Sequence, residues 1–501
     1  MTGIVDRTPW LTRRRLLTGV AIGGVALPLG LAAPLRSAAA ADRVSLPDVR
    51  ARGATDDRAA LAAALKTGRI VHLPAGRGTG PGGAYLLSAG PDAPNLPAGA
   101  RLVGDGIGRT IVHRLYGGGA AGVGEPFVFF CDSGSPDPSR NLAGISIADM
   151  TLVDDVVRNG FAEHEHLINV NGVTSLRIER VGFQGFRGDG LYLGSSTFVD
   201  GERHNVDVVV RDCEFDGINT NNRNGISIID GDRVTIDRCR FRRCSRHGGG
   251  GLTPPDPFNP RTGLGMPGGI DIEPNGYPFT IVRDIAISNC QFDTIGGAAV
   301  ALLLRPNDSV RVPLRGIRVT GCVVRNTATG IAFGGYGARN ALRGLPYDVE
   351  ISDNSFTQAD SPFIIDGAVG LTLRRNRFTD CAKAAELGYT NYNHDVQLID
   401  NEFTRVGYSR DGVNGMLIRY ADQVTLEGNS FVDCGRADGS AGRAINFERG
   451  DITRFRLINN RFESPGKRTA MAVDALGGKI DPRSFTSSGN IYGMPTNERL
   501  R

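Results

Sequence analysis

Residues 424–431 read Val-Thr-Leu-Glu-Gly-Asn-Ser-Phe, and this pattern decides the fold. Its first residues alternate between apolar and polar side chains, as a strand with one buried face does. It continues through a small polar residue, Asn429, to an aromatic one, Phe431. Copies of the pattern end at Phe215, Phe241, Phe292, Phe356, Phe378, Phe403 and Phe462, weaker copies end at Phe183 and Val324, and residues 145–152 carry a further trace of it. Such self-similarity predicts a repeat architecture.

The spacing of the copies indicates which architecture. Successive copies lie 22 to 32 residues apart, except for an interval of 51 residues between Phe241 and Phe292. A second short strand pattern lies between copies, for example at residues 225–228, 269–272 and 415–418. Short period-2 strands with Gly, Asn and Asp turns, at a repeat below the length of a propeller blade, predict coils of a parallel β-solenoid. We expect one all-β domain of about eleven coils.

Stacked coils place equivalent residues directly above one another, which accounts for the cysteines. One column holds Cys213, Cys239, Cys290 and Cys322 and continues as Asn354, Asn376, Asn401, Asn429 and Asn460. A second column holds Cys244, Cys381 and Cys434. We expect these Cys to pack in the core as small apolar residues, because no Cys-x-x-Cys spacing is present, and we expect the Asn side chains to hydrogen bond from coil to coil.

The chain divides into four segments. We expect residues 1–41 to be a signal peptide, residues 42–140 a cap with the first coils, residues 141–480 the solenoid, and residues 481–501 a C-terminal tail. In the cap, Thr55, Asp56 and Asp57 precede an Ala- and Leu-rich segment, which predicts a capped helix within residues 55–67.

These features resemble a known family. The helical cap, the segments Leu73–Gly76 and Leu102–Gly106, and the Cys/Asn and Phe columns are similar to those of the right-handed parallel β-helix proteins of the pectate-lyase-like superfamily. The resemblance implies a single-stranded right-handed parallel β-helix and a carbohydrate partner, since members of the superfamily are mostly polysaccharide lyases, glycoside hydrolases and epimerases. It also implies that a homotrimer is one candidate assembly.

The N-terminus predicts export. Residues 12–17 read Thr-Arg-Arg-Arg-Leu-Leu, and an apolar run leads to four Ala at residues 38–41, as in a twin-arginine signal with its cleavage site. We expect a secreted or extracytoplasmic protein with no stable membrane insertion after cleavage. Without residues 1–41 the net charge of +4 disappears, leaving 52 basic and 52 acidic residues, and this balance argues against nucleic acid as a partner.

The candidate active site lies in the longest interval between copies. Residues 268–275 read Gly-Gly-Ile-Asp-Ile-Glu-Pro-Asn and follow a Pro- and Gly-rich insertion at residues 245–267. Alternation along a strand places Asp271 and Glu273 on one face, and we expect both carboxylates to stand side by side on an exposed surface. A long loop in a compact protein is usually functional.

Aligning the second strands of neighbouring coils adds further candidate site residues. Ser227 and Ala301 are expected beside Asp271, with Asp230 and Arg305 just past the strand ends, so Asp271, Glu273, Asp230 and Arg305 form the predicted catalytic set. The predicted substrate-binding residues are Arg246, His247, Tyr389, Arg419 and Glu448. His164 and His166 stand at strand spacing and offer a two-residue metal pair without an evident third ligand.

Three functions stay open on the sequence. A paired-carboxylate glycoside hydrolase is the first, because neighbouring carboxylates raise one pKa, as a general acid requires. A calcium-dependent polysaccharide lyase or an epimerase acting on a uronate polymer is the second, with Asp230, Asp271 and Glu273 holding Ca²⁺; otherwise no cofactor is expected. A non-catalytic glycan-binding or envelope scaffold protein is the third, in which the carboxylates are solvated or pair with Arg residues of the insertion.

Overall fold

The computed structural model describes most of the chain after the predicted signal. The described residues are 42–87, 94–114, 128–162, 164–195, 202–219, 221–245, 268–304, 314–335, 347–409, 414–436, 442–448, 450–475, 479–480 and 482–496. Residues Arg43–Arg501 form one compact unit, separate from Met1–Asp42. No helix within the described residues has the length and apolar character needed to cross a membrane. The predicted signal peptide lies outside these residues.

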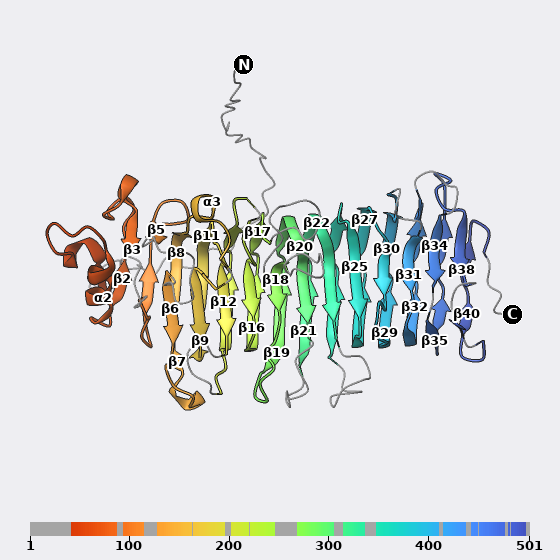
Figure 1. Ribbon diagram of the computed structural model, residues 1–501, viewed down its shortest axis with the longest axis horizontal. Coiled ribbons are helices and arrows are strands. Elements are labelled where there is room, and N and C mark those ends of the chain that lie inside the picture. The colour runs from red at the N-terminus through yellow and green to blue at the C-terminus, as the bar shows by residue number, and fades with distance from the viewer. Residues whose placement is uncertain are drawn as a thin grey trace, which may run out of the picture. The chain divides into compact units, whose positions relative to one another are not determined.

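The unit is a stack of coils in which each strand pairs in parallel with the equivalent strand of the next coil (Figure 1). The cap comprises β1 (Arg43–Ser45), α2 (Arg58–Leu65), β2 (Ile70–His72), β3 (Tyr85–Leu87), β4 (Arg101–Val103) and β5 (Ile111–Arg114). The first strands of the coils are β8 (Ser146–Val153), β11 (Arg177–Gln184), β13 (Val206–Arg211), β16 (Gly231–Asp237), β19 (Val282–Ser288), β21 (Arg315–Thr320), β23 (Val349–Ser352), β26 (Val369–Arg374), β29 (Asn393–Ile399), β32 (Ala421–Glu427), β36 (Arg456–Ile458) and β40 (Thr486–Ser488).

The repeated Phe lies on the next strand of each coil. These strands are β14 (Glu214–Asp216), β17 (Arg240–Arg242), β20 (Gln291–Leu303), β22 (Val323–Gly334), β24 (Ser355–Thr357), β27 (Arg377–Cys381), β30 (Glu402–Val406), β33 (Ser430–Val432), β37 (Arg461–Glu463) and β41 (Ile491–Tyr492). The second-strand face, which carries the candidate site, consists of β6 (Phe129–Asp132), β9 (Ile168–Asn171), β12 (Leu191–Gly194), β15 (Ile226–Ile228), β18 (Gly268–Ile272), the later parts of β20 and β22, β25 (Ser361–Asp366), β28 (Ala385–Leu387), β31 (Asn414–Ile418), β34 (Arg443–Phe447) and β38 (Met471–Asp474).

Short elements complete the coils at their turns. They are the helices η1 (Leu46–Val49), η2 (Pro81–Gly83), η3 (Pro138–Arg140) and α3 (Val156–Asn159) and the strands β7 (Leu142–Ala143), β10 (Val173–Thr174), β35 (Asp451–Thr453) and β39 (Lys479–Ile480). The short strands also pair in parallel from coil to coil, as β10 does with β7 and β35 with β39.

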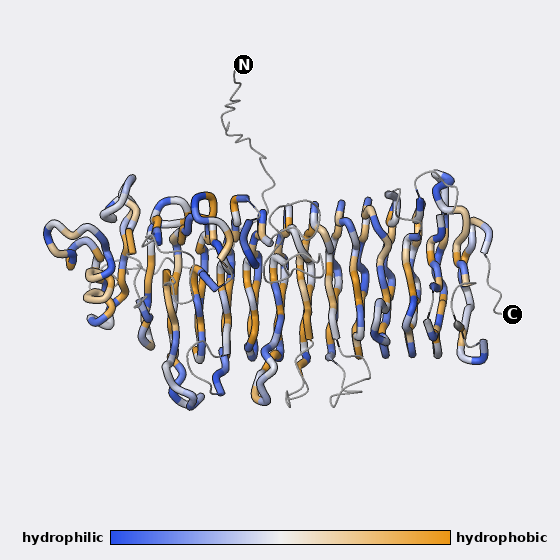
Figure 2. The backbone as a smooth tube through the Cα atoms, viewed as in Figure 1, coloured by the Kyte–Doolittle hydropathy of each residue, from blue (hydrophilic) through white to orange (hydrophobic). Residues whose placement is uncertain are grey.

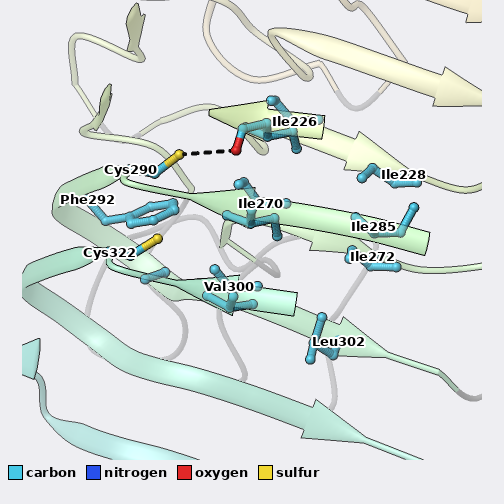
Figure 3. Close-up of a cluster of buried hydrophobic side chains, with 14 of the residues drawn as sticks. Ile226, Ile228, Ile270, Ile272, Ile285, Cys290, Phe292, Val300, Leu302 and Cys322 are labelled. Atoms are coloured by element: carbon cyan, nitrogen blue, oxygen red, sulfur yellow. Dashed lines mark hydrogen bonds between the residues drawn. The ribbon is translucent and has the colours of Figure 1, made fainter. Parts of the chain in front are cut away.

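The core lies inside the stack and is built from the alternating apolar residues. Ile226, Ile270 and Val300 follow one another on successive coils and point inward with Phe292 and Cys290 (Figure 3). Hydrophobic positions accordingly recur along the strands (Figure 2). All eight Cys are buried and unbonded, which confirms their predicted place in the core.

The predicted Asn column is a continuous ladder of hydrogen bonds, and the predicted Phe column is a stack of rings with one interruption. Phe183, Phe215, Phe241 and Phe292 stack with ring centroids 4.4 to 4.8 Å apart. After Val324 the stack resumes at Phe356 and continues through Phe378, Phe403, Phe431 and Phe462. Each buried Asn amide donates to the next Asn side-chain oxygen, as from Asn376 to Asn401 at 3.0 Å.

Two expectations about the ends need correction. Among the three expected capping residues, Asp56 accepts a hydrogen bond from the backbone N–H of Arg58, the first residue of α2, at 3.1 Å. The side chain of Asp57 does not cap the helix, because its buried carboxylate accepts hydrogen bonds from the backbone N–H groups of Thr79 and Leu86 and so joins the helix to the first coil. Part of the expected tail belongs to the stack, since β41 pairs with β37 and Tyr492 stacks on Phe462 at 5.3 Å.

Candidate active site

Asp271 lies at the centre of the second-strand face, in the predicted register. It is on β18, between Ser227 of β15 and Ala301 of β20. Ile270 and Ile272 of the same strand point into the core (Figure 3). The alternation that placed Asp271 outward is therefore confirmed, and Ser227 and Ala301 are its neighbours as expected.

The expected exposure of Asp271 was wrong, since none of its surface is accessible. The side chain of Asn224, just before β15, packs against it and donates from Nδ2 to the Oδ2 of Asp271 at 3.2 Å. Asn224 also donates to the Ser227 hydroxyl at 3.0 Å and accepts from the backbone N–H of Gly268 at 2.8 Å. The other oxygen of Asp271, Oδ1, has no hydrogen-bond partner among the described residues.

The environment of Asp271 favours its protonated form. Burial in the first place, and then the negative charge of Glu273, raise the pKa of Asp271 well above its usual value, while the positive charge of Arg223 opposes the shift. A raised pKa is what a carboxyl group needs to act as a proton donor.

Glu273 is the accessible member of the pair. It follows β18, extends the ladder by donating from its backbone N–H to Ile228, and leaves 45% of its side chain exposed. Its Oε2 lies 3.6 Å from Nη2 of Arg223, whose Nη1 lies 2.7 Å from the buried carboxylate of Asp189. Arg223 therefore connects an exposed carboxylate to a buried one.

A second layer of buried groups lies behind Arg223. The backbone N–H of Asp189 donates to Nδ1 of His166 at 3.1 Å, which places the imidazole proton on Nε2. Burial lowers the pKa of His166 well below its usual value, so the ring is neutral. It stacks on Tyr192 at 4.4 Å, and Tyr192 pairs with Ser227 in the sheet. The hydrogen bond to His166 holds Asp189 in position, and Asp189 in turn holds Arg223.

Sequence reasoning missed Asp189, Arg223 and Asn224. A signal was present, because Asp189 and Asn224 each stand directly before the Gly that opens a second strand, at Gly190 and Gly225. Equivalent residues of successive coils stack, so polar residues recurring at this place were candidates for contacts with Asp271.

The expected metal pair at His164 and His166 does not form. The two residues lie outside any strand, with His164 exposed and His166 buried. Glu165 between them contacts Nη1 of the buried Arg187 at 2.5 Å, and Arg187 also donates to the carbonyl of Gly160. These contacts stabilise the turn around α3.

Asp230 belongs to a different cluster from the one expected. Its buried carboxylate lies 3.1 Å from Nδ1 of His204 and accepts from the backbone N–H of Ile281 at 2.9 Å. Burial raises the pKa of Asp230 to about 6, with His204 opposing the shift. Burial lowers the pKa of His204, but its bonds to Asp230 and Glu202 outweigh this and raise it to about 8. The Asp230–His204 pair closes a turn. This contact of His204 was not predicted from the sequence.

The calcium alternative does not fit the described residues. They contain no group of three or more His, Cys, Asp or Glu side chains placed to hold a metal ion, so Asp230, Asp271 and Glu273 do not form a ligand set. The Asp230 carboxylate is already used by His204 and Ile281.

Three of the predicted substrate-binding residues come together farther along the face. Arg419, one residue past β31, contacts Glu386 of β28 at 2.8 Å and Glu448 at 2.9 Å. Its guanidinium lies 5.5 Å from the ring centre of Tyr389, which is 60% exposed. The other predicted residues, Arg246, His247 and Arg305, lie outside the described residues together with most of the insertion.

A surface cleft of about 430 Å³ lies elsewhere on the coils. Charged turn residues next to the Asn ladder line it, including Asp353, Arg375 and Glu402. Arg375 pairs with Asp353 at 2.7 Å, so the lining groups satisfy one another. The cleft is on the turns and not on the second-strand face.

Comparisons with known proteins agree with this architecture. Residues 269–480 match the family model of the right handed beta helix region. The A-module of mannuronan C-5 epimerase AlgE6 from Azotobacter vinelandii has a TM-score of 0.52 at 15% identity, covering 90% of this chain and 99% of its own. The N-terminal fragment of gene product 12 of bacteriophage Phi29 has a TM-score of 0.54 at 12% identity, covering 90% of this chain and 71% of its own. No curated protein sequence matches the chain significantly.

At these identities the structural likeness shows the fold alone. The catalytic domain of a GH87 α-1,3-glucanase in complex with nigerose is also similar, with a TM-score of 0.47 at 13% identity, and covers 92% of this chain and 71% of its own. The chain is a right-handed parallel β-helix protein, as the repeat and the resemblance predicted.

Proposed function

We propose that the protein is an exported carbohydrate-active enzyme that cleaves glycosidic bonds of a polysaccharide with Asp271 and Glu273 as its acid and base. The observation that carries the proposal is the asymmetry of the pair. Asp271 is buried and its pKa is raised, whereas Glu273, two residues later, is accessible and held near Arg223. The fold shared with a mannuronan C-5 epimerase A-module supports a carbohydrate partner.

The roles follow from the two environments. Asp271 would donate its proton to the glycosidic oxygen, and Glu273 would take a proton from the water that attacks the anomeric carbon. Cα atoms of residues i and i+2 on a strand lie about 6.6 Å apart, but the carboxyl groups of Asp271 and Glu273 are close enough to interact through a hydrogen bond. The two side chains must therefore separate around the glycosidic bond for this mechanism, and the anomer of the product shows whether the reaction inverts or retains.

The burial of Asp271 adds a requirement. Because Asp271 is fully buried, its proton reaches a substrate only when a covering side chain moves. Asn224, whose amide donates to Oδ2 of Asp271, is one such side chain. Bound sugar hydroxyls can replace the bonds that Asn224 makes to Asp271 and Ser227. Asn224 would then be a positioning residue that keeps the acid covered until substrate binds.

The proposal is tested on the purified wild-type protein and the variants Asp271→Asn and Glu273→Gln. Each protein is incubated with neutral and uronate-containing polysaccharides, with and without EDTA, and both reducing ends and the ultraviolet absorbance of unsaturated uronates are measured. We expect EDTA-insensitive reducing ends and a loss of about 100-fold or more in kcat/KM in either variant. Glu350→Gln, at another partly exposed carboxylate, serves as the control.

The other outcomes identify the rivals. An unsaturated product that disappears with EDTA would assign the protein to the calcium-dependent lyases. Full hydrolysis by Asp271→Asn would remove this residue from the reaction. Saturable glycan binding without turnover would favour a binding or scaffold protein.

A further inference from the structure

The candidate site and the Arg419 cluster lie on the same face of the solenoid. From Asp271 the outward row continues through Ala301, Ala332 and Ile364 to Glu386. These are four coil steps of about 4.8 Å, so the two ends are about 19 Å apart. Between the two ends the row holds small side chains, the buried Ala301 and the partly buried Ala332. A ligand that contacts both ends must therefore be an extended oligomer.

The Arg419 cluster, at the far end of the row, has side chains of the kinds that bind sugars. The exposed ring of Tyr389 offers a flat apolar surface of the kind that packs against the C–H face of a pyranose. Beside it, Arg419 offers N–H donors and the half-exposed Glu448 offers acceptors to hydroxyl groups. The ion pairs of Arg419 with Glu386 and Glu448 hold these groups in place.

The charges at the two ends select among polysaccharides. Arg419 is shared between the carboxylates of Glu386 and Glu448, and Arg223 is shared between those of Asp189 and Glu273. Each arginine is thus outnumbered by its acidic partners. A polyuronate would bring further negative charge to both ends, whereas a neutral chain brings hydroxyl groups that suit donors and acceptors alike.

We propose that Tyr389, Arg419, Glu386 and Glu448 form a remote subsite for a neutral polysaccharide chain that runs along the second-strand face toward Asp271. The direction of the chain rests on the proposed function, but the subsite itself rests on the geometry of these four residues. The substrate class is therefore a neutral glycan, and uronate polymers are disfavoured.

The subsite is tested by affinity electrophoresis of the whole protein in native gels. Laminarin, soluble starch, galactomannan and xyloglucan are the neutral probes, and polygalacturonate and alginate are the anionic ones. We expect at least one neutral probe to retard the wild type more than either anionic probe. Tyr389→Ala should bind that probe about 10-fold more weakly, because a lost stacking contact costs on the order of 1.4 kcal/mol, while Tyr389→Phe keeps the affinity.

The result separates the subsite from the proposed reaction. Retardation only by anionic probes, no retardation by any probe, or unchanged binding in Tyr389→Ala would overturn the subsite. Asp271→Asn should retain binding, since Asp271 acts in the reaction and Tyr389 in recognition. If Tyr389→Ala binds normally while Asp271→Asn loses turnover, the reaction stands without the subsite. The reverse pattern keeps the subsite and removes the reaction.

Discussion

The Asn ladder and the cluster around Asp271 are both rows of buried polar groups, but they satisfy their hydrogen bonds differently. In the ladder each amide has the same partners on every coil: Asn401 donates to Asn429 and to the carbonyl of Leu373. Around Asp271 the hydrogen-bond partners differ from one group to the next, and Oδ1 of Asp271 has no partner among the described residues. The ladder stabilises the stack of coils. The cluster around Asp271 instead buries ionisable groups, and this burial lowers the stability of the protein.

The largest effect is expected from breaking the ladder with Asn401→Leu. The backbone N–H and the side-chain amide of Asn376 would both lose their acceptor in the core. We expect the free energy of unfolding to fall by about 2 to 4 kcal/mol, since each buried group left unpaired costs about 1 to 3 kcal/mol. Denaturant titration checks this, with Arg377→Gln at an exposed ion pair with Glu402 as control. A change as small as the control's would mean that the ladder is dispensable.

The opposite sign is expected for Asp271→Asn. The folded-state pKa of Asp271 is raised, so its contribution to stability is present below its unfolded pKa, near 4, and is lost as the pH rises toward the folded value. An Asn has no such loss, and we expect the variant to be more stable than the wild type at neutral pH by about 1 to 3 kcal/mol. Unfolding measured from pH 4 to 8 should show the difference growing with pH. A less stable variant would contradict the comparison.

A smaller, pH-dependent effect is expected at His204. Its folded-state pKa of about 8 lies above the ordinary value of 6.5. Its stabilising contribution is therefore complete below pH 6.5 and disappears as the pH rises through 8. Thermal unfolding of wild type and His204→Gln should differ most at pH 6.5 and converge above pH 8. A difference that does not change with pH would show that His204 acts through packing alone.

The smallest effect is expected on the surface. Arg375 pairs with Asp353 at 2.7 Å, but both side chains are about half exposed. Exposed ion pairs contribute about 0 to 1 kcal/mol, so Arg375→Gln should leave the denaturation midpoint nearly unchanged. Asn376, one residue later, is buried, so the two positions compare an exposed ion pair with a buried side-chain amide. A loss comparable to that of Asn401→Leu would place the stability of the turns in their ion pairs.

The repeat made the architecture predictable, and the site only partly so. The repeated strand pattern with its period-2 alternation fixes the register, so the neighbours of Asp271, the Cys and Asn columns and the Phe stack followed from residue positions alone. The burial of Asp271 did not follow, because Asn224 reaches it from a turn, where period-2 alternation does not say which way a side chain points. For the same reason His204 and Arg223 were missed.

The unequal lengths of the coils have an evolutionary consequence. Intervals between the ends of successive copies range from 22 to 51 residues, yet Phe241 and Phe292, on either side of the longest interval, stack at 4.7 Å like their neighbours. Residues can thus be inserted or deleted at a turn without loss of the core. The strands are held to a common template, while each turn can diverge on its own, so new specificities can arise by small steps in a protein that continues to fold.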